Sequence, residues 1–305
     1  MRRTRNVTRL HLDPPRPFAF DQTVVSHGWY LIPPFRWDAN DSVLHRVERL
    51  GNEAVELRIR FTTRLVIESD SDLSQWQDEI GARIGRMFQL HVDLSDFVAL
   101  CRTSPDHQHV RKETCGRLLC AATRFEDAIK IIATTNTTWR QTVRTMTLLS
   151  ESLGTKSPSG LHAFPDAAQI AAAPIELLGA CRLGYRAGTI MALARGIVDG
   201  SIDLETLADP SQSTIEMMRS FQQLPGIGPY GAAHLAAMEG RFDFIAVDTE
   251  FRRFVRERYH QGRKVSDATL QRRYRKWGKW KYLAYWSELW NEIASVTGKP
   301  SQLPD

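Results

Sequence analysis

A glycine turn and one carboxylate are the groups in this sequence whose types and spacing could do chemistry together. The turn is Leu-Pro-Gly-Ile-Gly-Pro-Tyr-Gly over residues 224–231, and Asp248 follows it. Gly226 and Gly228 are expected to take positive φ, which glycine adopts readily, so that the backbone can approach a ligand closely. The free N–H groups at the start of the next helix carry the positive end of the helix dipole and suit a phosphate.

The turn is predicted to join two helices. Residues 213–223 carry apolar side chains at helical spacing before it, and the Ala-rich residues 230–239 follow it. Pro229 suits the first turn of the second helix, where a missing N–H costs nothing. Asp248 precedes a third helix, expected over residues 251–259, and could simply be its N-cap. Beside a phosphate-binding turn, the same carboxylate could instead face the sugar that carries the phosphate.

A basic block follows the carboxylate. Residues 251–281 hold twelve Lys or Arg against two acidic residues, a balance of +10 in a chain whose net charge is +5. Aromatic residues are interleaved with these cations. The block favours a polyanion partner such as nucleic acid, although a solvated basic helix face would have the same composition.

The chain as a whole has the length and composition of a soluble protein with two or three domains, at 305 residues and 42% apolar content. No apolar run reaches the length of a membrane span. The Arg-rich residues 1–17 lack the apolar core of a secretory signal, so a basic tail is expected there. Four cysteines are too few for a disulfide framework at this length, and Cys115 and Cys120 are interpreted as buried small residues. His107-x-His109 is a weak metal signal.

The remaining pattern divides the chain in two. Residues 18–92 mix short β-like runs, a hairpin turn at Gly51-Asn52, a strand near residues 64–68 and a helix over residues 73–88. From residue 93 onward the pattern is helical. The expected fold class is therefore α+β, with an N-terminal antiparallel β-sheet domain (18–92), an all-helical region in two subdomains (93–297) and a polar tail (298–305).

Two segments resemble the helix-hairpin-helix DNA glycosylase superfamily: LPGIGPYGA at residues 224–232 and AVDTEFRRF at residues 246–254. Further similar segments, in the same order, are the early helices that end at Asn136 and Leu-Gly-Tyr-Arg-Ala at 183–187. The resemblance covers roughly residues 93–290. The preceding sheet, with His-Gly-Trp-Tyr at 27–30 and Phe-Arg-Trp at 35–37, is similar to that of bacterial 3-methyladenine DNA glycosylase II and of 8-oxoguanine glycosylase.

The resemblance implies roles for particular residues. Asp248 would be catalytic, and Tyr230 and Trp286 would line the pocket for the damaged base. Tyr230 stands where bifunctional members carry a Schiff-base lysine, so no AP-lyase activity is expected. The resemblance also implies a hairpin that binds DNA phosphates, made by Pro225, Gly226, Ile227, Gly228 and Gly231, and a group that wedges into the duplex or contacts the opposite base, made by Asn136, Tyr185 and Arg186.

No cofactor or catalytic metal is expected, although the hairpin carbonyls could hold a monovalent cation. No cysteine follows Cys181, so the iron–sulphur cluster of the endonuclease III branch is absent. The expected partner is double-stranded DNA containing a damaged base, bound by a monomer away from any membrane. The protein would be cytoplasmic, at the nucleoid, if it is bacterial. It would be nuclear if it is eukaryotic.

The expectation is a monofunctional DNA glycosylase of base-excision repair, a hydrolase that flips a damaged base and cuts its N-glycosidic bond with Asp248. Tyr230 and the Trp-rich last helix favour alkylated bases. The rival substrate is an oxidised purine such as 8-oxoguanine, which Gly184-Tyr185-Arg186 and Phe35-Arg36-Trp37 favour. A non-catalytic damage sensor is the alternative from another class, but it has no use for a carboxylate beside phosphate.

Overall fold

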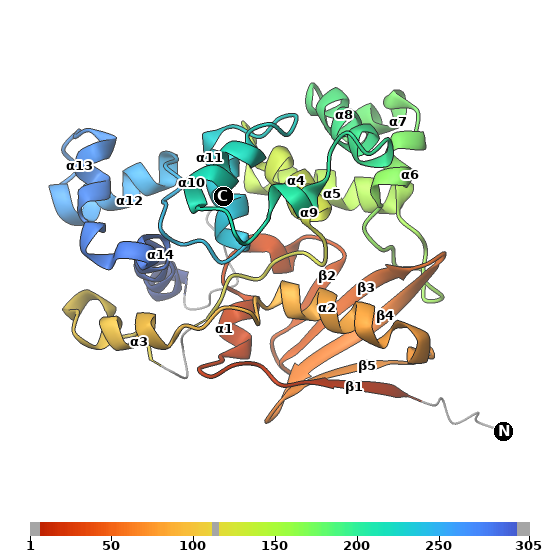
Figure 1. Cartoon of the computed structure of the whole chain (residues 1–305), viewed down its shortest axis with the longest axis horizontal. Helices are drawn as coiled ribbons and strands as arrows, with labels where there is room; N and C mark the ends of the chain where they lie inside the picture. Colours follow the sequence, from red (N-terminus) through yellow and green to blue (C-terminus); the bar gives the residue numbers. More distant parts are fainter. Residues whose placement is uncertain (1–6, 112–115, 298–305) are drawn as a thin grey trace.

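A computed structural model describes residues 7–111 and 116–297, with side chains as far as Ile293 (Figure 1). Cys115, residues 1–6 of the expected basic tail and the tail from residue 298 lie outside this description. Figure 1 shows a β-sheet at one end of the molecule, α4 to α8 above it and α12 to α14 on the other side. The α+β class expected from the sequence is confirmed.

The sheet has five antiparallel strands in the order β1-β5-β4-β3-β2. Their bounds are β1 (Thr8–Leu12), β2 (Phe35–Asp38), β3 (Val43–Leu50), β4 (Glu53–Phe61) and β5 (Leu65–Ser69). The hairpin expected at Gly51-Asn52 is confirmed: Leu50 pairs with Glu53, and Gly51 takes a φ of +58°.

The expected tail over residues 1–17 is wrong for residues 8–12, because β1 pairs with β5 from Thr8–Ser69 to Leu12–Leu65. Alternate residues of β1, Leu10 and Leu12, pack against the core, so a pattern of period two was present in the segment. The prediction of short β-like runs in the 18–92 domain is also wrong for its first segment, residues 20–31. This segment forms two short helices, whose apolar residues enter the core; a short apolar run does not distinguish the two structures.

Helices make up most of the remainder. Their bounds are α1 (Phe20–Val24), α2 (Gln77–Met87), α3 (Ser95–Arg102), α4 (Arg124–Thr134), α5 (Trp139–Leu153), α6 (Ala167–Ala172), α7 (Ile175–Ala180), α8 (Arg186–Val198), α9 (Leu204–Leu207), α10 (Thr214–Phe221), α11 (Pro229–Met238), α12 (Thr249–His260), α13 (Asp267–Arg272) and α14 (Lys281–Thr297), with 3-10 helices η1 (Gly28–Leu31), η2 (Ser74–Trp76), η3 (Pro105–His107) and η4 (Arg275–Trp280). None of the helices in the described segments is long and apolar enough to cross a membrane.

The helix before the turn begins at a capping box. The Ser213 side chain accepts the backbone N–H of Glu216, and the Glu216 carboxylate accepts the N–H of Ser213 in return. The three helices expected around the turn and the carboxylate are confirmed as α10, α11 and α12.

Two hydrophobic cores meet at α11. The larger core joins the sheet to α2, α4, α8 and one side of α11, where Ala232 and Ala236 are buried. The second core joins α3, α12 and α14 to the other side of α11, through Ala233 and Ala237. The expected boundary at residues 92 and 93 therefore does not separate the two cores, because the sheet shares its core with helices from α4 onward.

The hairpin turn depends on one of its two central glycines. Gly226 has a φ of +78°, and a Cβ on it would lie 2.4 Å from the Cγ2 atom of Thr189. Gly228, in contrast, has a φ of −89° and caps α11, and a Cβ there would meet nothing within 4 Å. The expectation of positive φ is thus confirmed at Gly226 and wrong at Gly228, whose extended backbone suits any N-cap residue.

We expect Gly226→Ala to lower the free energy of unfolding by about 1–3 kcal/mol, because the side chain would be strained at positive φ and would collide with Thr189. Gly228→Ala is the matched control and should change stability by about 0.5 kcal/mol or less. Urea denaturation followed by circular dichroism measures both. Equal destabilisation of the two variants would contradict this account of the turn.

Candidate active site

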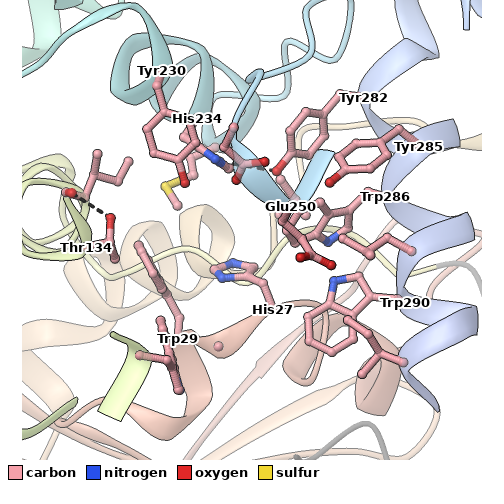
Figure 2. A pocket seen from close by; sticks show the side chains of 18 residues that line it. His27, Trp29, Thr134, Tyr230, His234, Glu250, Tyr282, Tyr285, Trp286 and Trp290 are labelled. Carbon is pink, nitrogen blue, oxygen red and sulfur yellow. Dashed lines mark hydrogen bonds between the residues drawn. The ribbon is translucent and has the colours of Figure 1, made fainter. Parts of the chain in front are cut away.

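A cavity of about 310 Å³ lies between the two cores and is walled mostly by aromatic rings (Figure 2). Tyr230 and His234 project into it from successive turns of α11. Figure 2 shows Tyr282, Tyr285, Trp286 and Trp290 of α14 on another wall, and His27 and Trp29 opposite α11. Asp248 and Glu250 also line the cavity. Segments far apart in the sequence thus build one space.

Asp248 is the N-cap of α12 as well as a wall residue of the cavity. Its Oδ1 accepts the backbone N–H of Phe251 at 2.6 Å, which holds the carboxylate in place. The side chain is half-buried, and burial raises the pKa of its carboxyl above the ordinary aspartate value. Asp248 can therefore cap α12 and also act at the cavity. Its Oδ1 oxygen orients the carboxylate through the bond to Phe251, while the carboxylate still lines the cavity wall.

Tyr230 begins a line of aromatic groups. Its ring meets the edge of His234, one turn on, with 4.5 Å between ring centroids. The Nδ1 atom of His234 lies 3.3 Å from the hydroxyl of Tyr282. Burial raises the pKa of Tyr230, and the negative charge of the nearby Asp248 raises it further. The hydroxyl of Tyr230 therefore stays neutral.

Trp286 is held as a wall of the cavity. Its ring stacks on Tyr282 at 5.4 Å with an interplanar angle of 16°, and its Nε1 donates to the carbonyl of Ser26 at 2.7 Å. Trp290 meets the edge of Trp286 at 6.0 Å. Tyr282, Trp286 and Trp290 recur every four residues on α14, so they share one helix face.

The opposite wall belongs to η1, in the segment that joins α1 to the sheet. The His27 Nε2–H donates to the carbonyl of Leu119 at 2.6 Å, and burial lowers the pKa of the ring to about 3. Trp29 donates from Nε1 to the Asp127 carboxylate at 2.7 Å. Arg86 of α2 also donates to Asp127, at 2.6 Å, so this carboxylate joins both the η1 wall and α2 to α4.

The ionisable groups that can carry charge at the cavity are acidic: the carboxyls of Asp248 and Glu250. Burial lowers the pKa of His234 to about 4, so both histidines are neutral near pH 7. No Lys or Arg occurs among the described residues that line it. Glu250 accepts from Arg253 Nε at 3.0 Å, which draws this carboxylate toward a cation on the next turn of α12. Asp248 has no ion pair of this kind in the described segments.

The hairpin residues named from the sequence divide into two groups. Gly226 and Gly228 are exposed, and Pro225 is half-buried. Ile227 and Gly231 are buried, and a Cβ on Gly231 would lie 3.1 Å from the Cγ2 atom of Ile131 on α4. Ile227 and Gly231 pack the hairpin against α4, so the exposed part of the hairpin is Gly226 and Gly228; phosphate binding by the five residues stays a prediction. The carbonyl of Leu224 accepts the Ile227 N–H and keeps a second lone pair, which is compatible with a cation.

Asn136, Tyr185 and Arg186 come together away from the cavity lining. Asn136 has a φ of +48°, and its side-chain amide donates to the Tyr185 hydroxyl at 3.2 Å. The Tyr185 ring is 68% exposed and lies 4.8 Å from the Arg186 guanidinium carbon. Arg186 donates to the carbonyls of Thr135 and Asn136 and to the Thr135 hydroxyl. These hydrogen bonds brace the turn that carries Asn136, and contact of the three residues with an opposite base stays a prediction.

Sequence reasoning missed most of the cavity wall. His234 could have been found from Tyr230 at a spacing of four, and Tyr282 and Trp290 from Trp286 at the same spacing. His27 and Trp29 had no local signal. Of the other tryptophans in the basic block, Trp277 and Trp280 are core residues. His107 and His109 lie close to backbone carbonyls of α14, and no metal-binding cluster occurs in the segments that the structure describes. Cys120 is buried, as expected.

We expect Arg186→Ala to loosen the turn at residues 135–137, since the hydrogen bonds from the guanidinium to its carbonyls would be removed, and to cost about 1–2 kcal/mol of stability. Hydrogen exchange of the amides there should become faster. Arg195→Ala removes an exposed cation from the same helix and should leave exchange at this turn unchanged. Unchanged exchange in Arg186→Ala would show that Arg186 is no brace.

No protein-family model and no curated protein sequence matches the chain. Solved structures do match it. A 3-methyladenine DNA-glycosylase from Archaeoglobus fulgidus has a TM-score of 0.74 at 18% identity, over 94% of this chain and 99% of the other. A Clostridium acetobutylicum 8-oxoguanine glycosylase/lyase, in complex with double-stranded DNA containing cytosine opposite 8-oxoguanine, has a TM-score of 0.71 at 16% identity, over 95% and 98%.

The protein named MBOgg1, in complex with a low-affinity DNA ligand, has a TM-score of 0.73 at 19% identity, over 95% of this chain and 99% of the other. These matches extend over the sheet and the helices alike. The chain therefore has, along nearly its whole length, the fold of the helix-hairpin-helix DNA glycosylases that its hairpin and Asp248 segments resemble.

Proposed function

We propose that this protein is a monofunctional DNA glycosylase that hydrolyses the N-glycosidic bond of an alkylated base in duplex DNA. The observation that carries the proposal is the Asp248 carboxylate, half-buried at the wall of an aromatic cavity and close in sequence to an exposed glycine hairpin. The fold supports it, since the similar structures include a 3-methyladenine DNA-glycosylase and an 8-oxoguanine glycosylase/lyase bound to DNA.

Base release requires the damaged base to leave the helical stack. The cavity of about 310 Å³ would receive it, and unstacking costs least for a damaged or mismatched base. The exposed backbone at Gly226 and Gly228, at the positive end of the α11 dipole, would hold a phosphate of the same strand. The protein would act as a monomer on double-stranded DNA.

Cleavage of the N-glycosidic bond builds positive charge on the sugar ring. The ionised Asp248 carboxylate would stabilise that charge and take a proton from the attacking water. Its N-cap bond to Phe251 fixes its position before reaction, so little reorganisation is needed. Because burial raises the pKa of Asp248, the ionised form is lost at a higher pH than for an exposed aspartate, and base release should decline on the acid side accordingly.

The electrostatics of the cavity favour an alkylated base over an oxidised one. Ring alkylation of a purine leaves it cationic, whereas 8-oxoguanine is neutral. Aromatic faces attract cations, and the wall offers Tyr230, Tyr282 and Trp286 together with two carboxylates. The two histidines of the wall are neutral and add no repulsion.

Oxidised guanine is the second candidate. It is favoured by the exposed Tyr185 ring beside Asn136, a pair placed to fill the gap left by a flipped base. Against it, Arg186 already donates to the turn at residues 135 and 136, which leaves fewer N–H groups for an opposite cytosine. An enzyme for alkylated bases has no need to read the opposite base.

We expect Asp248→Asn to leave DNA affinity nearly unchanged and to lower the rate of base release by at least about 10²–10³-fold, because the amide carries no charge to oppose the sugar cation. Single-turnover kinetics at saturating duplex separate the rate from binding. The amide can still accept the Phe251 N–H, so a melting curve should show a folded protein. Turnover near the wild-type rate would remove Asp248 from the proposal.

We expect base release without strand cleavage. Tyr230 has no amine, so no Schiff base forms with the sugar. Duplexes carrying 3-methyladenine, 7-methylguanine, hypoxanthine or 8-oxoguanine should be cut only after alkali, with the cationic 7-methylguanine and 3-methyladenine released fastest. Borohydride should trap no covalent adduct. A trapped adduct would contradict the monofunctional mechanism, and fastest release of 8-oxoguanine would favour the second candidate.

A further inference from the structure

Ten of the twelve cations in the basic block over residues 251–281 are of two kinds. One kind is neutralised within the fold by acidic partners. These ion pairs are Arg252–Asp267 at 2.8 Å, Arg253 with Glu250 and Glu257 at 2.5 Å each, Arg258–Glu292 at 4.0 Å, Arg273–Asp106 at 2.5 Å and Lys279–Asp96 at 3.3 Å. Such cations have little charge left for an outside partner.

Five other cations of the block are exposed and form no ion pair with any residue in the described segments: Arg263, Lys264, Arg272, Arg275 and Lys276. We call these five the distal basic patch. Within residues 263–276 the one acidic residue is Asp267, and Arg252 already neutralises it. The patch therefore carries a net charge that the fold leaves uncompensated.

The patch gathers near the C-terminal end of α12. The pair Arg252–Asp267 joins the start of α12 to the start of α13, and Arg273, just after α13, lies 3.9 Å over the ring of Tyr259 near the end of α12. These two contacts place α13 beside α12, and Figure 1 shows both helices on the same side of the molecule. The backbone N–H of Arg263 donates to the carbonyl of His260 at 2.9 Å, so the loop that carries Arg263 and Lys264 also lies at the C-terminal end of α12.

Compensation of the helix dipole does not account for the patch. Cations at a helix C-terminus are stabilised only within the last turn, and three of the five lie on α13 and η4 instead. Arg258 and His260 already occupy the last turn of α12.

The patch lies at a definite distance from Asp248, because α12 connects them. The helix has twelve residues, and a rise of 1.5 Å per residue gives about 18 Å from its N-cap to its end. Phosphates along one strand of a duplex are about 3.4 Å apart per base pair, so a duplex that lies along α12 would cover about 18 Å in about five base pairs.

We propose that the duplex lies along α12 and that the distal basic patch binds its phosphates on one side of the lesion, about five base pairs from it. The inference rests on the proposed function, which places duplex DNA at Asp248. The patch would add salt-dependent affinity without reading sequence, and it would help the protein to stay on DNA while it searches.

The test compares two triple variants with the same net charge. Arg272→Gln, Arg275→Gln and Lys276→Gln together remove most of the patch. The control combines Arg36→Gln, Arg102→Gln and Arg195→Gln, three exposed cations on β2, α3 and α8. Three duplex probes of about 24 base pairs carry a stable abasic-site analogue. In the first the analogue is at the centre; in the other two it is about four base pairs from one end or from the other, so that one flank is missing. Melting curves confirm that both variants fold.

On the central probe, the patch variant should bind about tenfold more weakly than wild type, and the slope of log K against log salt should fall by about 2.7, or about 0.9 for each of the three phosphates no longer neutralised. On the probe that lacks the flank bound by the patch, the patch variant should bind as tightly as wild type. On the probe that lacks the other flank, the patch variant should bind more weakly than wild type. The control should match wild type on all three. Equal weakening on every probe, or equal behaviour of patch variant and control, would overturn the proposal.

The outcome is separable from that of the proposed function. Base release measured on the lesion panel with the wild-type protein tests the enzyme. If no base is released but binding still depends on one flank, the glycosylase proposal fails and the patch stands. If base is released and no flank dependence is found, the patch alone is wrong.

Discussion

The structure depends on one constraint: α11 must belong to two hydrophobic cores at once. Its alanines face the sheet-side core on one side and the α12–α14 core on the other. Small residues allow both to approach closely, and a helix that is apolar all round is stable only when buried. The first turn of α11 is the part that leaves these cores, and it carries Tyr230 into the cavity between them. The position of the hairpin, the cavity and Asp248 all follow from this packing.

The N-terminal sheet is part of the same arrangement. Arg46 on β3 donates to Glu126 on α4 at 2.6 Å, and Lys130 lies 2.7 Å from the same carboxylate, all of them buried. Buried ion pairs of this kind are costly to break, because removal of one partner leaves an uncompensated charge. Together with the Arg86–Asp127 pair and the Trp29–Asp127 hydrogen bond, they hold the sheet, α2 and the η1 segment against α4. The sheet thereby supplies His27 and Trp29 to a cavity built otherwise from helices.

Electrostatics divide the site into regions with different tasks. The cavity is acidic and aromatic, the hairpin offers exposed backbone N–H groups, and the block after Asp248 is basic. Many cations of the block are engaged in internal ion pairs, so its composition alone overstates the charge that a partner would meet. The raised pKa of Asp248 and the lowered pKa of His234 have the same first cause, burial, and a pKa of about 4 leaves His234 neutral near pH 7.

Local patterns in the sequence predicted the α10–turn–α11 hairpin, the cap at Asp248, the β3–β4 hairpin and the fold class, because each is encoded by residues within a few positions of one another. Cap, turn and helix periodicity act over that range. The sequence also pointed to Tyr230 and Trp286 as cavity residues, through resemblance. Only the tertiary structure decided that β1 joins the sheet, that Gly228 needs no positive φ, that Ile227 and Gly231 face the core and that Arg186 is committed to a turn. It also brought His27 and Trp29 opposite α11. These outcomes depend on contacts between segments far apart in the chain. There, packing selects the partner of each side chain, and no local pattern in the sequence does.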